Sequence, residues 1–273
     1  MMKKKTLLGL FLLLVMQVWA QTPEDREAFA AIKWNNISNP GGITCKQASC
    51  RLFGSDQHIT WLEFSPDKFR LELSQPAKRT KPARQGKAEG ALAAINGGFF
   101  QTKTNDAVAN DFLKIADSIY ISAGGWGDAA LAIDKEGRLH FTPWNASSQE
   151  SMDWQQSYPN VMVVGPLLVL DGTVLIGKSD EKRHPRTIAG AKPDGTIVLA
   201  VIDGRRKGMD GMASWESARL AALLGLESCI NLDGGGSSSL WLKDKGTVSK
   251  PSDQALFFHK PRKVANFLLV YPR

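Results

Sequence analysis

The stretch Asn231-Leu232-Asp233-Gly234-Gly235-Gly236-Ser237-Ser238-Ser239 places a carboxylate beside a run of glycines and hydroxyls. Apolar residues flank it on both sides, so it is expected to link two buried strands. Glycine lets backbone approach a ligand closely, and successive N–H groups in such a turn form an anion-binding concavity. Asp233, at the rim, could act as an acid, a base or a metal ligand. A hairpin needs one or two glycines, so a purely structural turn is the weaker alternative.

Polar residues at other strand ends could complete a site around this turn. The segment Asn96-Gly97-Gly98-Phe99-Phe100 offers an amide and glycines to a phosphate or sugar oxygen, and its aromatics either stack on a sugar or pack in the core. Arg186 and Thr187 begin a strand and could hold an oxyanion, with a surface arginine as the alternative. Asp203 and Arg205 follow an apolar strand, where polar side chains are well placed to line a cleft. An ordinary turn would explain this last pair equally well.

Glu216 lies in the first turn of a predicted helix, where a carboxylate also complements the helix dipole. No histidine pair has the i, i+4 spacing of a metal site, and no Gly-x-Ser-x-Gly motif supports a Ser-His-Asp hydrolase. Glycoside cleavage commonly uses two carboxylates, and a phosphodiester needs cationic and N–H donors on its oxygens. Carboxylates, arginines and glycine-rich turns together predict a site that breaks a glycosidic bond beside a phosphate.

The elements that must position these residues are mostly short strands. Asp-Gly or Glu-Gly signals predict three hairpins, which join 129–134 to 138–141, 161–170 to 173–176, and 186–191 to 196–202. A further hairpin is expected between His58–Phe64 and Phe69–Leu73, across Ser65-Pro66-Asp67. Pro166 indicates an edge or a bulge in the second pair.

Helices are predicted only in a few places. One covers Pro23–Ile32, and a stronger one starts at Ser214 as N-cap and ends at Gly225. Val264–Tyr271 is expected to form a final buried strand. Many hairpins with few helices predict an α+β fold: a single domain with a mixed, largely antiparallel twisted β-sheet core and a few packed helices.

The first twenty residues have the pattern of a signal peptide, with Lys3-Lys4-Lys5 before the apolar run Thr6–Met16 and a small residue at Ala20. We therefore expect export to the periplasm or the medium, with no membrane anchor after cleavage. In an oxidising compartment Cys45 and Cys50 could form a disulfide, and two unpaired thiols are the alternative. The net charge of +7 includes three signal-peptide lysines, and the remainder suits anionic ligands without indicating nucleic acid.

The ordered motifs NGGFF, GPLLVLDG, RTIAG, DGR, a helix with Glu, NLDGGGSSS and a terminal VAN strand resemble the phosphodiester glycosidase family. The likeness covers roughly residues 90–272. We therefore predict a signal peptide over 1–20, an N-terminal extension packed on the core over 21–89, and a phosphodiester glycosidase domain over 90–273. Ala213 and Cys229 depart from the family pattern, which leaves the core motifs in place.

The resemblance implies a hydrolase that cleaves the anomeric C–O bond of a sugar-1-phosphodiester, resembling an N-acetylglucosamine-1-phosphodiester, and releases the free sugar. Asp233 and Glu216 are the expected catalytic pair, with Asp203 as an orienting or alternate acid. Arg186 and Arg205 are expected to hold the phosphodiester. The other predicted substrate-binding residues are Asn96, Gly97, Thr187, Gly234, Gly235 and Ser237.

Two other functions stay open on these residues. The first is a metal-dependent phosphodiesterase, in which Asp203, Glu216 and Asp233 would bind Ca²⁺ or Mg²⁺ through hard oxygen ligands. The second is a non-catalytic envelope protein that binds anionic glycans. The glycosidase interpretation requires no cofactor and takes a sugar-1-phosphodiester or a phosphoglycan as substrate. The oligomeric state, the sugar and the stereochemical outcome do not follow from the residues.

Overall fold

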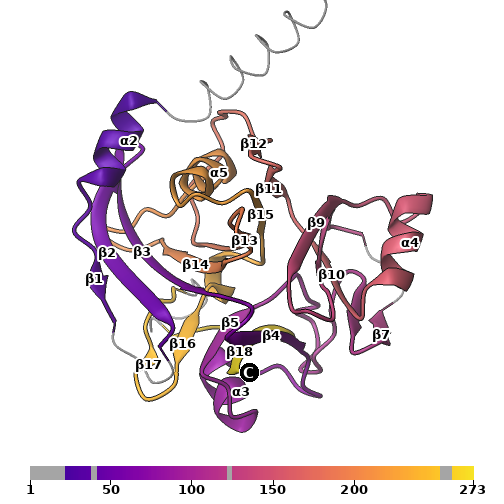
Figure 1. Ribbon diagram of the computed structural model, residues 1–273. Coiled ribbons are helices and arrows are strands. Elements are labelled where there is room, and N and C mark those ends of the chain that lie inside the picture. The colour runs from indigo at the N-terminus through magenta and orange to yellow at the C-terminus, as the bar shows by residue number, and fades with distance from the viewer. Residues whose placement is uncertain (1–21, 38–41, 122–124, 253–259) are drawn as a thin grey trace, which may run out of the picture.

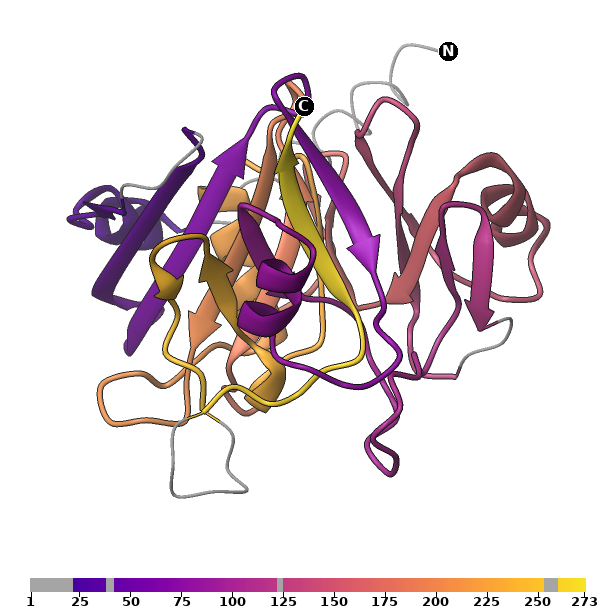
Figure 2. The same cartoon turned by 90° about the horizontal axis from the view of Figure 1, so that it is seen from below.

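The computed structural model describes residues 22–37, 42–121, 125–252 and 260–273 (Figure 1), so the predicted signal peptide lies outside the described residues. Three antiparallel sheets form the molecule, and helices cover parts of them (Figures 1 and 2). This confirms the predicted α+β fold on a largely antiparallel core. No helix within the described ranges is long and apolar enough to cross a membrane.

The large sheet contains eight strands and carries most of the predicted site. Their order across the sheet is β1 (Asn35–Asn36), β2 (Thr44–Leu52), β3 (Ser55–Phe64), β14 (Ile197–Asp203), β13 (Arg186–Ala191), β15 (Ser228–Asn231), β11 (Leu167–Leu170) and β12 (Thr173–Val174). The predicted β13–β14 hairpin is present. The second predicted hairpin is present only in part, because the predicted strand 161–170 is divided: Leu167–Leu170 pairs with β12, whereas Asn160–Val164 belongs to another sheet. Since β3 pairs with β14 over seven residue pairs, from Ile197 opposite Phe64 to Asp203 opposite His58, the N-terminal region is built into the sheet.

Two five-stranded sheets complete the core. The C-terminal sheet has the order β17 (Gly246–Thr247), β16 (Leu240–Leu242), β5 (Ala93–Asn96), β18 (Phe267–Pro272) and β4 (Phe69–Ser74). The outer sheet has the order β7 (Ser118–Ile121), β6 (Leu113–Ile115), β10 (Asn160–Val164), β8 (Ala129–Ile133) and β9 (Leu139–Pro143). The β8–β9 hairpin is as predicted.

Each helix packs against a single sheet. α2 (Pro23–Ala30) lies beside β2, α3 (Pro82–Ala88) beside β5 and β16, and α5 (Ser214–Leu223) on the large sheet; α4 (Gln149–Ser157) sits on the outer sheet (Figure 1). Thr22 caps α2, because its hydroxyl accepts the N–H of Asp25. The predicted cap of α5 is wrong: Ala213 holds the N-cap position and Ser214 is the first helical residue.

Side chains alternate between the two faces of the large sheet, and this alternation separates two cores. Ile188 and Ile202 pack with Met212 and α5 on the helix face. Ala189 and Val201 pack on the opposite face, in the main core that the large sheet shares with the other two sheets. Successive residues of β13 and β14 therefore belong alternately to one core and to the other.

The predicted β3–β4 hairpin is wrong. A turn does form, with the N–H of Lys68 donating to the carbonyl of Ser65, but β4 leaves the large sheet and pairs with β18. Leu71 and Leu73 of β4 thereby enter the main core between the sheets. The local turn signal does not specify which partner the second strand takes, and burial of these leucines decides it.

The Cys45–Cys50 disulfide is also wrong, because both residues lie in strand β2 and are free thiols. Five residues of extended chain separate the Cα atoms by roughly 16 Å, well beyond the 4.4–6.8 Å that a disulfide spans. Burial raises the pKa of Cys45 to about 12 and that of Cys50 to about 11, so neither thiol ionises readily.

A reducing agent is therefore expected to leave thermal stability unchanged. The melting temperature of the protein should be the same with and without dithiothreitol, because no covalent loop between these two cysteines constrains the unfolded state. Cys50→Ser should likewise unfold at nearly the same temperature as the parent. A melting temperature that falls on reduction would contradict the strand placement of the two cysteines.

Candidate active site

The Asn96 side chain, at the end of β5, forms hydrogen bonds that support the glycine-rich turn. Its Nδ2 donates to the carbonyl of Asp233 at 2.6 Å, and its Oδ1 accepts the Thr187 hydroxyl at 3.0 Å and the N–H of Ser239 at 3.1 Å. The Thr187 hydroxyl lies 3.1 Å from the Ser238 hydroxyl as well. Asn96 and Thr187 are fully buried. The structure thus brings both residues to the predicted site as supports for the turn.

Close contacts explain why two positions of the site are occupied by glycine. The N–H of Asp233 donates to the carbonyl of Gly97 at 3.0 Å, and a Cβ at Gly97 would lie 2.3 Å from Oδ1 of Asn266. Gly235 has a φ of +63° while its N–H donates to the carbonyl of Pro185 at 2.8 Å. A side chain at either position would push the turn away from its supports.

Asp233 is the carboxyl group that this turn presents. Protein atoms surround it on nearly every side, yet part of the residue's surface stays accessible. Burial raises its pKa from 3.8 to about 6, and Ser237, Arg262 and the N–H of Gly234 offset only part of that rise. The Ser237 hydroxyl is close enough to lower the pKa of Asp233, although it forms no hydrogen bond of regular geometry. A pKa near 6 suits a group that gives or takes a proton near neutral pH.

Cationic groups lie around this carboxyl. A methyl group at Gly235 would come within 3.0 Å of Nη1 of Arg205, so this guanidinium lies against the turn. Its Nη2 is 3.2 Å from Nδ1 of His184. Burial lowers the pKa of His184, and the nearby Arg205 and Arg186 lower it further, which favours the neutral imidazole. The N–H of Arg262 donates to the carbonyl of Gly236. The charge of Arg262 also lowers the pKa of Asp233, so Arg205 and Arg262 both supply positive charge to the turn.

Arg186 points to the helix face of the large sheet, away from the side that Thr187 occupies. Its Nε donates to the carbonyl of Met212 at 2.8 Å, and its guanidinium is paired with Glu181. Glu181 also accepts the N–H of Ser214 at 2.8 Å, at the start of α5. In this arrangement Arg186 ties the segment before β13 to α5. Its predicted contact with a phosphodiester stays a prediction.

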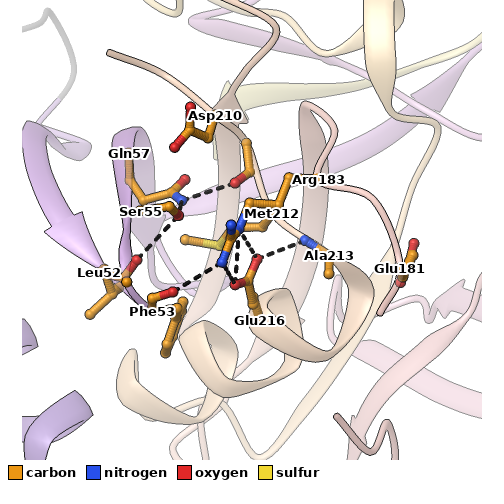
Figure 3. Close-up of polar contacts among 12 residues, drawn as sticks. Leu52, Phe53, Ser55, Gln57, Glu181, Arg183, Asp210, Met212, Ala213 and Glu216 are labelled. Carbon is orange, nitrogen blue, oxygen red and sulfur yellow. Dashed lines mark hydrogen bonds and ion pairs between the residues drawn. The ribbon is translucent and has the colours of Figure 1, made fainter. Parts of the chain in front are cut away.

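Glu216 is fully buried in an ion pair with Arg183 (Figure 3). Nη2 of Arg183 lies 2.6 Å from Oε1, and Nε lies 3.0 Å from Oε2. Oε2 also accepts the N–H of Ala213 at 2.9 Å, while Nη2 of Arg183 donates to the carbonyl of Phe53. Both carboxylate oxygens are thus engaged in joining α5, the β2–β3 hairpin and the segment before β13.

Asp203 forms a second buried pair, at the end of β14. Its Oδ2 is 2.8 Å from Nδ1 of His58, which lies directly across in β3, and its Oδ1 accepts the N–H of Lys250 at 2.9 Å. The side chains of this pair are at most 3% exposed. By the alternation of β14, Asp203 belongs to the same face of the sheet as Thr187.

Apart from Asp203, which pairs with His58 at the end of β14, the predicted site residues separate into two groups. Those brought together around the turn are Asn96, Gly97, Thr187, Arg205, Asp233, Gly234, Gly235 and Ser237. Arg186 and Glu216 lie in the ion-pair network on the helix face instead. No group of three or more histidine, cysteine or acidic side chains that could hold a metal ion occurs in the part of the chain that the structure describes. The catalytic roles of Glu216 and Asp203 stay predictions.

Four residues of these networks were not predicted: His58, Glu181, Arg183 and Arg262. Glu181 and Arg183 belong to a charged segment, Glu181-Lys182-Arg183-His184, that precedes β13. Such a segment is typical of a solvated loop, and only its buried partners on α5 show otherwise. His58 sits in an apolar strand, and only the register of β3 against β14 reveals its carboxylate partner.

The sequence is similar to a known protein family over most of its length. Residues 89–271 match the family model described as phosphodiester glycosidase. The N-acetylglucosamine-1-phosphodiester alpha-N-acetylglucosaminidases of Bos taurus and Homo sapiens are each 27% identical to the chain over 71% of its length. The chain spans about two fifths of the length of these curated relatives, with coverage of 39% and 40%.

Solved structures share the fold. The catalytic domain of the zebrafish N-acetylglucosamine-1-phosphodiester alpha-N-acetylglucosaminidase superposes with a TM-score of 0.64 at 22% identity, covering 89% of this chain and 82% of that one. A hypothetical protein from Synechocystis has a TM-score of 0.62 at 17% identity, covering 88% and 64%. Because the family model covers well over half of the chain, this protein belongs to the phosphodiester glycosidase family.

Proposed function

We propose that this protein hydrolyses the anomeric C–O bond of a sugar-1-phosphodiester and releases the free sugar. The observation that carries the proposal is the Asp233 carboxyl group, which has a pKa of about 6 and lies in a glycine-rich turn that Arg205 and Arg262 contact. The names of the mammalian relatives favour an N-acetylglucosamine-type sugar. The sequence favours export and a substrate of the cell envelope or its surroundings.

Asp233 acts in this proposal as the general acid. Cleavage of the C–O bond leaves the phosphate as a monoester dianion, whose conjugate acid has a pKa of about 6. A donor with a pKa of about 6 is matched to that leaving group, so proton transfer needs little driving force in either direction. The burial that raises the pKa of Asp233 also leaves a larger fraction of this carboxyl group protonated near neutral pH than an exposed aspartate would have.

Arg205 and Arg262 would stabilise the charge that develops on the phosphate as the bond breaks. Charge-assisted hydrogen bonds from guanidinium groups are strongest where water is excluded, which the buried turn provides. His184, held neutral, supports Arg205 without adding a further charge. Glu216, or Asp203 on the face that Thr187 shares, remains the predicted second carboxylate that directs water to the anomeric carbon.

Product analysis tests the proposal. With N-acetylglucosamine-1-phospho-methyl as substrate, we expect free N-acetylglucosamine and methyl phosphate, detected by ¹³C and ³¹P NMR, and the same rate in the presence of EDTA. Attack of water at phosphorus would instead release N-acetylglucosamine 1-phosphate and methanol, or would release the same two products but place ¹⁸O from labelled water in methyl phosphate rather than in the sugar. That outcome, or activity that EDTA removes and Ca²⁺ or Mg²⁺ restores, would favour the metal-dependent phosphodiesterase.

A further inference from the structure

Basic residues from two distant segments meet on one surface of the protein. The segment 78–87 contains five lysine or arginine residues and no acidic one, and Lys260-Pro261-Arg262-Lys263 adds three more. The two segments run antiparallel, because the N–H of Thr80 donates to the carbonyl of Val264 at 3.0 Å and the N–H of Val264 donates back at 2.8 Å (Figure 2). A single charged run is typical of a solvated face, and here the fold joins two of them.

One end of this basic surface lies at the active-site turn. The N–H of Arg262 donates to the carbonyl of Gly236 at 3.2 Å, and the charge of Arg262 lowers the pKa of Asp233. The positive charge of the surface is therefore continuous with the positive charge around the catalytic carboxyl group.

The surface continues from Arg262 onto helix α3. Lys263 lies beside Lys81, because each is the neighbour of one residue of the antiparallel bridge. Lys81 is the N-cap residue of α3, and Arg84 and Lys87 follow at intervals of three residues, about 4.5 Å apart along the helix axis. We call this set of five residues, from Arg262 to Lys87, the basic ridge.

Most of the basic ridge has no neutralising carboxylate. At its margin Lys78 pairs with Asp106, and at the end of α3 the Glu89 carboxylate accepts a hydrogen bond from Gln85. Four side chains of the ridge form no ion pair with any carboxylate in the part of the chain that the structure describes: Lys81, Arg84, Lys87 and Lys263. Like charges at these spacings repel one another, so a chain of anions that lies along the ridge would relieve the repulsion.

We propose that the basic ridge binds the anionic chain of a polymeric substrate, a phosphoglycan in which phosphodiesters repeat. The inference rests on the proposed function, because the turn around Asp233 must hold the reacting phosphodiester. A chain that extends from this turn brings its further phosphates to Lys263, Lys81 and Arg84. Guanidinium and ammonium groups bind phosphate oxygens through charge-assisted hydrogen bonds, and the summed field of the ridge attracts the polyanion before it docks.

Turnover of a substrate series of increasing length tests the ridge. The series consists of N-acetylglucosamine units joined through 1,6-phosphodiesters, with one to four phosphates, and N-acetylglucosamine-1-phospho-methyl is the reference. In about 20 mM NaCl the KM of the four-phosphate chain is expected to lie about tenfold below that of the reference, since each exposed ion pair contributes about 1.5-fold to fivefold. In about 1 M NaCl, where the Debye length is about 3 Å, this advantage should disappear.

Removing three charges of the ridge should remove the effect of length. The triple variant Lys81→Gln, Arg84→Gln, Lys263→Gln is expected to raise the KM of the four-phosphate chain about tenfold. Its kcat and KM for the phospho-methyl compound should stay within about twofold of the parent, because that compound reaches only the turn. Unchanged turnover of the small substrate also shows that the variant is folded.

A charge-matched control separates the ridge from the net charge of the protein. The triple variant Arg26→Gln, Lys33→Gln, Lys135→Gln removes three charges at exposed positions on and after α2 and in the β8–β9 turn. It is expected to leave the KM of every substrate unchanged. Equal KM values along the length series in the parent, or equal losses in the two triple variants, would overturn the ridge as a binding surface.

Binding then separates the ridge from the proposed chemistry. The four-phosphate chain, labelled with a fluorophore, is titrated with the Asp233→Asn protein and followed by fluorescence anisotropy, so that turnover does not enter. Salt-sensitive binding that the ridge variant loses, without turnover of any substrate in the parent, would reject the glycosidase while the ridge stands. Turnover of the phospho-methyl compound without tighter binding of longer chains would reject the ridge while the glycosidase stands.

A competitor of another class tests the choice of polymer. A thymidine pentanucleotide, which also carries four phosphates, is expected to displace the labelled chain more weakly than the unlabelled phosphoglycan does. It presents no sugar-1-phosphodiester to the turn around Asp233, so only the ridge contributes to its binding. Equal affinity of the two competitors would overturn the phosphoglycan and make the ridge a surface for single-stranded nucleic acid.

Discussion

Replacing Asp233 by Asn is expected to lower kcat for a sugar-1-phosphodiester by about 10²–10⁴-fold, the usual contribution of a general acid. The amide has nearly the same shape as the carboxyl group, and the backbone contacts of Asp233 with Asn96 and Gly97 do not involve its side chain. The glycine-rich turn should therefore keep its conformation. Single-turnover kinetics with N-acetylglucosamine-1-phospho-methyl measure the effect. A variant that keeps full activity would remove Asp233 from the chemistry.

The pH dependence of kcat/KM identifies the role of this group in the parent protein. A general acid must be protonated, so the rate should fall tenfold per pH unit above about pH 6. Asp233→Asn should lose this dependence. A rate that rises through pH 6 instead would make Asp233 the nucleophile or general base, since those roles require the carboxylate.

The same pKa predicts that Asp233 destabilises the fold when it is ionised. The fold favours the protonated form of Asp233, so the stability that this group contributes is complete below pH 3.8 and is lost as the pH rises through about 6. The gap between 3.8 and about 6 corresponds to about 3 kcal/mol at most. Above pH 6 the Asp233→Asn variant should therefore have a higher free energy of unfolding than the parent. Urea titrations at pH 4 and pH 8 check this, and an equal difference at both values would contradict it.

Local signals in the sequence were sufficient for the hairpins β8–β9, β11–β12 and β13–β14, because an Asp-Gly or Glu-Gly turn and its two strands are adjacent in the chain. The partner of β4 is β18, almost two hundred residues later, and no local signal encodes that pairing. The cysteine-containing strand β2 was missed for a related reason. Its polar residues lie near the edge of the large sheet, so its sequence lacks the apolar run of a central strand.

The candidate site shows the same division between local chemistry and long-range packing. Residue type and spacing predicted that Asn96 and Asp233 belong together, and the 2.6 Å hydrogen bond between Asn96 and the Asp233 carbonyl agrees with that. Burial then separates their tasks, since Asn96 is engaged in supporting the turn while Asp233 keeps an accessible surface. For Glu216, the sequence shows a helix-start carboxylate but not the Arg183 guanidinium that pairs with it. That partner comes from a loop 33 residues earlier, and only the fold brings the two together.

Arg183→Met is expected to destabilise the protein by about 3 kcal/mol, at the lower end of the 3–5 kcal/mol for breaking a buried ion pair because Arg183 is 37% exposed. The change leaves the fully buried Glu216 carboxylate with only the N–H of Ala213 as a hydrogen-bond partner among the described residues. For a chain of this size, the melting temperature should fall by about 6–12 °C. Arg51→Met, which breaks an exposed pair with Asp56, is the matched control and should cost less than about 1 kcal/mol.

Two further variants distinguish a structural role of the Arg183–Glu216 ion pair from a catalytic one. They are Glu216→Gln and the double variant Arg183→Met, Glu216→Gln. If the ion pair is a structural joint, the double variant should be more stable than Arg183→Met alone, because no unpaired charge remains buried. Glu216→Gln should then retain turnover at temperatures where it is folded, since its amide oxygen can still accept the N–H of Ala213. Differential scanning fluorimetry and activity are measured on the same samples. A Glu216→Gln protein that is fully folded and inactive would instead establish Glu216 as the second carboxylate of the reaction, with Arg183 holding it in place.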